Sequence, residues 1–97
     1  MAIVQELYNY LDEVIPRSLS CSWDNDGLML CPNPYEKVNK VLLALDATDE
    51  VADYAVQNGF DVIVTHHPMI FSPLRSLCAS DPIPRRALFL AKNGISV

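Results

Sequence analysis

The sequence predicts an α/β fold with three layers and a mostly parallel sheet. Two apolar runs of strand length, residues 41–45 and 62–65, enclose a segment with helical periodicity. Such a strand–helix–strand unit places its two strands parallel, through a right-handed crossover. One helical pattern precedes the unit and another follows it. The predicted order is therefore helix, β-α-β unit, helix and the start of a further strand.

The first predicted helix lies at the N-terminus. Ile3, Leu7, Leu11 and Val14 recur at helical spacing, and mostly polar side chains fill the opposite face. Pro16 ends this pattern, because proline lacks the amide hydrogen that a helix interior requires.

Turn-forming residues dominate the next segment. Positions 23–27 hold Trp-Asp-Asn-Asp-Gly, and Asp, Asn and Gly favour tight turns. We expect Trp23 to lie in a core or an interface, as a single tryptophan usually does. Residues 28–30 are predicted to form a short strand before Pro32.

The β-α-β unit has clear boundaries. The run at 41–45 is continuously apolar, which is typical of a strand buried on both faces. Thr48 is a predicted N-cap for the central helix. Asn58 and Gly59 end that helix, and 62–65 forms the second buried strand.

Prolines at positions 68, 73, 82 and 84 predict a long irregular stretch after the second strand. A helix is expected at 85–92, and 95–97 has the composition of a strand beginning. We interpret residues 1–97 as the single N-terminal part of a larger α/β domain whose C-terminal half is absent.

Composition disfavours several classes of protein. The net charge is -5, which disfavours nucleic-acid binding, because binding to the phosphate backbone needs clustered Lys and Arg. The three cysteines form no CxxC pair, so neither a disulfide framework nor a thiolate zinc cluster is indicated. No signal peptide is recognisable, and no apolar run approaches the ~20 residues that span a bilayer. We expect a cytoplasmic protein without membrane contact.

Polar residues follow both predicted strands. Asp46 follows the first, and His66 and His67 follow the second. The carboxyl ends of parallel strands share one sheet edge, where ligands of α/β proteins bind. Neutral imidazole is a common ligand of zinc, iron, nickel and manganese.

Three readings of the histidine pair stay open from the residues alone. Adjacent side chains of an extended chain point to opposite sides, so each histidine could bind its own metal of a dinuclear pair. Alternatively, one histidine binds metal and the other bonds to a neighbour, or both are satisfied by hydrogen bonds. Asp46 and Thr48 also fit helix capping, and Asn25 also fits a turn.

Three motifs together resemble the start of the NIF-three-like family, whose members are often named type 2 GTP cyclohydrolase I homologues. They are Ser-Trp-Asp-Asn-Asp-Gly-Leu at 22–28, Ala-Leu-Asp-Ala-Thr at 44–48 and Ile-Val-Thr-His-His-Pro-Met-Ile-Phe at 63–71. The resemblance covers essentially the whole chain.

The resemblance implies a hexameric ring and a dinuclear metal centre. It assigns His66 and His67 as ligands of different ions, two divalent transition-metal ions (Zn, Fe, Mn or Ni) per full-length chain. The family's remaining ligands, an Asp, a His and a Glu, have no counterpart in these residues.

For the full-length protein, the resemblance implies a metal-dependent hydrolase acting on a nucleotide or related small molecule. Asn25, Asp46 and Thr48 are candidate pocket-lining residues. The chain alone is expected to be inactive and to self-associate. The alternative is a non-catalytic interaction or regulatory protein, in which the metals stabilise the ring or a partner surface.

Overall fold

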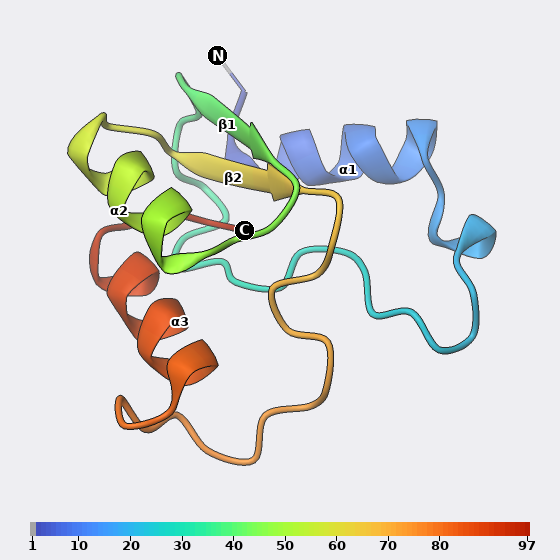
Figure 1. Cartoon of the computed structure of the whole chain (residues 1–97). Coiled ribbons are helices and arrows are strands. Elements are labelled where there is room, and N and C mark those ends of the chain that lie inside the picture. Colours follow the sequence, from blue (N-terminus) through green and yellow to red (C-terminus); the bar gives the residue numbers. More distant parts are fainter. Residues whose placement is uncertain (1) are drawn as a thin grey trace.

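The computed structural model describes residues 2–97. Its elements, in chain order, are α1 (Val4–Val14), the 3₁₀ helix η1 (Arg17–Leu19), β1 (Val41–Ala44), α2 (Asp49–Gln57), β2 (Val62–Thr65) and α3 (Pro82–Lys92). Figure 1 shows α2 and α3 together on one side of the two-stranded sheet and α1 away from them. The predicted α/β class and order of elements are confirmed.

The sheet is parallel, as the β-α-β pattern predicts. β1 pairs with β2 in a register that runs from Val41 opposite Val62 to Ala44 opposite Thr65. Ser96 forms a parallel bridge to Val62 on the other side of β2. The chain therefore begins a third strand where its sequence predicts one.

Local signals fix the ends of α2. The Thr48 hydroxyl accepts a hydrogen bond from the Val51 amide at 3.1 Å and so caps the first turn. Asn58 ends the helix, and Gly59 follows with a φ of +69°, a left-handed conformation that favours glycine. Both predicted boundaries are confirmed.

Of the other two helices, α1 ends as expected and α3 begins earlier than expected. α1 ends before Pro16 as predicted, and the Glu6 carboxylate accepts from the Ile3 amide at 3.1 Å at its start. α3 begins at Pro82, three residues before the predicted start. Proline is compatible with a first helical turn, because the amides there have no partner within the helix.

The core lies between the sheet and the α2–α3 layer. Its buried members come from β2, both helices and the segments that flank them: Ala47, Ala52, Ala55, Ile63, Met69, Ala87, Leu90 and Ile95. Ala52 and Ala55 allow α2 to approach the sheet closely, since small side chains occupy its inner face. This core holds β2 rigidly from one side.

Two predictions about burial and strands are wrong, and one of two alternatives for Trp23 is excluded. Exposure alternates along β1, so that run is covered on one face only, and Leu43 is 74% exposed. Residues 28–30 form no strand, although the Met29 and Leu30 amides donate to the Val97 carbonyl. Trp23 is 68% exposed, which excludes the core, and its place in an interface stays a prediction. Apolar composition identified these segments but not what covers them.

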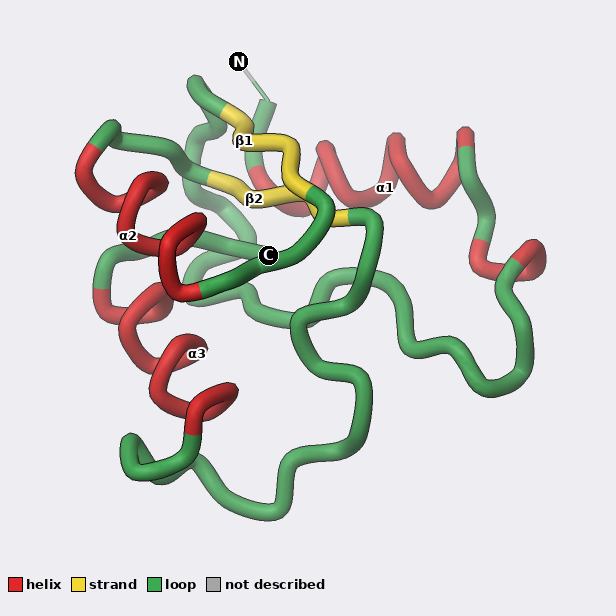
Figure 2. Tube along the Cα trace, in the orientation of Figure 1, coloured by secondary structure: helices red, strands yellow, loops and turns green. Residues whose placement is uncertain are grey.

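Figure 2 shows the long irregular connection between β2 and α3, in agreement with its prolines. Among the described residues, none of the helices has the length and apolar character needed to cross a membrane.

Candidate metal centre

Backbone pairing brings the two strand ends together beyond the sheet itself. The His66 amide donates to the Ala44 carbonyl at 3.2 Å, and the His67 amide donates to the Leu45 carbonyl at 2.9 Å. The two chains therefore stay side by side until the polar residues begin. This is the shared edge that the parallel topology predicts.

The acidic and basic strand ends meet at this edge. Nδ1 of His67 lies 2.9 Å from Oδ1 of Asp46, 21 positions earlier in the chain. Both side chains are more than half exposed, at 59% for His67 and 56% for Asp46. Asp46 does not cap α2, because Thr48 does so.

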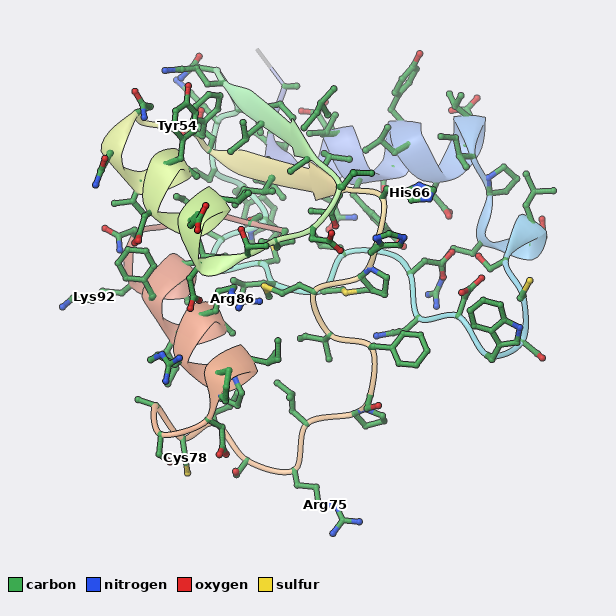
Figure 3. The ribbon with its side chains drawn as sticks, viewed as in Figure 1. Tyr54, His66, Arg75, Cys78, Arg86 and Lys92 are labelled. Atoms are coloured by element: carbon green, nitrogen blue, oxygen red, sulfur yellow. The ribbon has the colours of Figure 1, made fainter. Side chains whose placement is uncertain are left out.

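The two histidine rings lie close to one another. Their centroids are 4.8 Å apart and their planes are inclined by 58°. The chain bends at both residues as it leaves β2, so the alternation of an extended strand does not hold there. The expectation that the two side chains point to opposite sides is corrected accordingly. Figure 3 shows His66 beyond the end of β2.

A cavity of about 140 Å³ lies beside His66. Its walls are mostly apolar and come from α1, from residues 25–29, from β2 and from Val97. Its few polar contributors include Tyr8, Asn25 and Thr65. No sequence pattern singled out Tyr8, which lies on the apolar side of an ordinary amphipathic helix.

Asn25 and Thr48 have different surroundings. Asn25 lines the cavity, and its side-chain amide donates to the Ile70 carbonyl, which ties the 23–27 turn to the segment after the histidines. Thr48 caps α2 and, among the described residues, does not appear in the wall of this cavity. The structure thus groups Asn25 with His66 and Asp46 with His67.

A small polar cluster supports the turn that carries Asn25. Ser20 donates to Asp26, and Arg17 Nε donates to the same carboxylate at 3.1 Å. The Ser20 hydroxyl, and then the Arg17 guanidinium, hold the pKa of Asp26 below its ordinary value. Ionised Asp26 therefore anchors the turn to η1 at neutral pH.

The donor set fits part of a metal site. Two exposed imidazoles are suitable nitrogen ligands, and one of them already has a carboxylate partner. No group of three or more His, Cys, Asp and Glu side chains suited to one ion occurs within the described 2–97 range. A typical four-coordinate centre needs further ligands.

Comparison with known proteins shows the family to which this chain belongs. The family model described as Duf34/NIF3 (NGG1p interacting factor 3) matches residues 2–97. The chain belongs to this family. The protein NIF3 homolog of Schizosaccharomyces pombe is 38% identical over 97 residues, which cover 98% of this chain and 35% of the relative. A GTP cyclohydrolase 1 type 2 homolog of Clostridium perfringens is 32% identical over 94 residues, covering 97% of this chain and 36% of that protein.

Solved structures share this fold. A Bacillus cereus protein described as related to NIF3 superposes with a TM-score of 0.87 at 32% identity, covering 99% of this chain and 26% of that one. The crystal structure of Staphylococcus aureus protein SA1388 superposes with a TM-score of 0.89 at 35% identity, covering 98% of this chain and 27% of that one. The chain thus spans about a third of the length of the curated relatives named above.

Proposed function

We propose that His66 and His67 are two ligands of a dinuclear divalent-metal centre, one for each ion, and that the full-length protein is a metal-dependent hydrolase. The observation that carries the proposal is the exposed pair of imidazoles, 4.8 Å apart, at the carboxyl edge of the parallel sheet. Exposure leaves the rings accessible to ions and to ligands from elsewhere. Two such ions, when bound, activate a water molecule and stabilise a leaving oxygen.

The cavity beside His66 supports a small-molecule substrate. A cavity of about 150 Å³ accommodates benzene in an engineered protein, so about 140 Å³ suits a single ring. Mostly apolar walls with a few polar groups are typical of ligand sites. The proposed substrate is a nucleotide or a related small molecule, with one ring beside His66.

Zinc titration of the 97-residue chain tests the metal ligands. The exposed thiols of Cys21 and Cys78 are competing soft donors, so the titration uses a variant with both replaced by serine. We expect His66→Ala and His67→Ala each to weaken zinc binding, and the double variant to abolish it. Unchanged binding in the double variant would show that the histidines are structural.

A chimaera tests the complete centre. The chain replaces the matching segment of the Schizosaccharomyces pombe relative, and metal content is measured by elemental analysis. We expect about two ions per chain, and the loss of about one in each single histidine variant. A metal-loaded chimaera is then screened against nucleotides and phosphoesters.

Turnover that disappears on metal removal supports the hydrolase. Absence of turnover with verified metal loading would favour the second candidate, a non-catalytic interaction protein. Several large apolar side chains offer contact surface for a protein partner or for another copy of the chain: Leu19, Trp23, Tyr35, Leu43 and Leu45 are each more than 60% exposed. Self-association, including the expected hexameric ring, is part of the proposal in both cases.

A further inference from the structure

The hydrogen bond between Asp46 and His67 distinguishes the two histidines. His67 Nδ1 has a carboxylate oxygen at 2.9 Å. Within the described residues, the ring nitrogens of His66 have no such partner. One ring of the pair is therefore oriented by a side chain, and the other is not.

His67 is held at three points. Its amide donates to the Leu45 carbonyl at 2.9 Å, and its carbonyl accepts from the Thr65 hydroxyl at 2.6 Å. The Asp46 carboxylate fixes the ring itself. Backbone pairing brings Asp46 beside His67, because Asp46 directly follows Leu45, whose carbonyl accepts from the His67 amide.

No other contact in the described structure accounts for Asp46. The cap of α2 is Thr48, and the ion pair that joins α2 to α3 uses Asp49. The Asp46 carboxylate is 56% exposed, so water can solvate it and it does not need a protein partner to remain ionised. Across residues 2–97, the one hydrogen bond of its side chain is to His67.

This contact selects a tautomer. An ionised carboxylate only accepts hydrogen bonds, so Nδ1 of a neutral imidazole beside it must carry the proton. The lone pair of the ring then lies on Nε2, directed away from Asp46. A carboxylate in this position also makes the outer nitrogen a better ligand.

We infer that Asp46 is a positioning residue: it holds His67 in the Nδ1–H tautomer and so makes Nε2 the atom that binds metal. The inference rests on the proposed metal function. It assigns to Asp46 a role that differs both from helix capping and from direct metal ligation.

The first measurement is made on the metal-free chain. Long-range ¹H–¹⁵N spectra at about pH 8.5, where free imidazole is neutral, report which nitrogen carries the proton. We expect His67 to carry it on Nδ1, and Asp46→Asn to move it toward Nε2. Asp46→Glu keeps an acceptor and should largely retain Nδ1–H. Asp53→Asn removes an exposed carboxylate from α2 and should change nothing.

The second measurement is zinc affinity in the same variants. Loss of such a supporting carboxylate typically weakens metal binding about 10- to 100-fold, so Asp46→Asn should do so while Asp53→Asn does not. An unchanged His67 tautomer in Asp46→Asn would overturn the inference even if zinc binding depends on both histidines. If Asp46→Asn leaves the tautomer unchanged but abolishes zinc binding as completely as His67→Ala does, Asp46 is itself a metal ligand. That result also overturns the inference. If neither the parent chain nor the chimaera binds metal, the proposed function fails and the metal role of Asp46 fails with it, whereas the tautomer of His67 is read independently on the metal-free chain.

Discussion

The two faces of the sheet differ in how well helices cover them. On the face toward α2 and α3, Ile63 is 1% exposed and belongs to the core. Leu42 lies beside it on the same face, in register, and packs against that core. On the opposite face Leu43 lies beside Val64 but remains 74% exposed. Neighbouring leucines of one strand therefore have opposite surroundings.

The difference shows what each layer contributes. The α2–α3 layer fixes the position of β2 and so of the strand end that carries the histidines. The α1 layer leaves a cavity against β2, with His66 and Thr65 in its wall. The sheet is therefore packed against a core on one face and borders a mostly apolar cavity on the other, and such cavities are typical of ligand sites.

Substitutions on the two faces of the sheet should differ most in how much they lower the free energy of unfolding. Ile63→Ala should lower the free energy of unfolding by about 2–5 kcal/mol, because it leaves a cavity in a packed core. Leu43→Ala removes an exposed side chain and should change it by less than about 0.5 kcal/mol. Urea denaturation of both variants measures the difference. Ile63→Val, with an expected loss of about 0.5–1.5 kcal/mol, gives a folded reference. Equal losses at both positions would contradict the assignment of faces.

A substitution at Gly27 tests whether the turn that packs against α1 has a restricted conformation. Its φ is +110°, and a Cβ atom there would lie 3.2 Å from the Tyr8 hydroxyl. Gly27→Ala should cost about 1–3 kcal/mol through backbone strain. Thermal unfolding checks this, with Ala79→Gly in the exposed connection as a neutral comparison. A fully tolerated Gly27→Ala would mean that this turn adapts freely.

The N-cap of α2 contributes to the stability of the helical layer that packs on the covered face of the sheet. Thr48→Ala should destabilise the protein by about 1 kcal/mol, because the Val51 amide loses its acceptor. Thr48→Ser keeps the acceptor and should lose much less. Urea midpoints compare the three proteins, and equal midpoints for the alanine and serine variants would rule out the capping role.

The Asp49–Arg86 pair adds a small pH-dependent term on the same side. Arg86 Nε donates to Asp49 at 2.8 Å, which holds the pKa of Asp49 below its ordinary 3.8. The folded-state pKa is the lower one, so the stabilisation is fully present above pH 3.8 and is lost as pH falls through the lowered value. In Figure 3 Arg86 lies between α2 and α3.

Asp49→Asn should therefore lower the unfolding midpoint slightly at neutral pH, and the difference from the parent protein should vanish in strong acid. Asp53→Asn, on the same helix, is the control. A difference that grows as the pH falls would mean that the pKa of Asp49 is not lowered in the folded protein.

Much of the fold could be predicted because its signals are local. Thr48 and Gly59 delimit α2 through their own side-chain and backbone properties, and the apolar run 62–65 matches β2. That Asp46 and the histidine pair lie at one edge of the sheet also followed from the sequence, since parallel strands must bring their carboxyl ends to the same edge.

Other features depended on segments far apart in the chain. Leu43 and Trp23 are as apolar as core residues, but exposure depends on whether another layer reaches them. The cavity exists because α1, the 25–29 turn and β2 meet there, and no local pattern records that meeting.

The sequence by itself determined the order of the elements, the ends of α2 and the edge of the sheet where chemistry is expected. The first two follow from periodicity and backbone hydrogen bonding within a few residues, and the third follows from the parallel direction of the two strands. The tertiary structure alone decided which face of β1 is covered, that the His66 and His67 rings lie side by side, and that Asp46 meets one of them. Those features arise from a bend in the chain and from packing between distant segments, whose geometry no single stretch of sequence specifies.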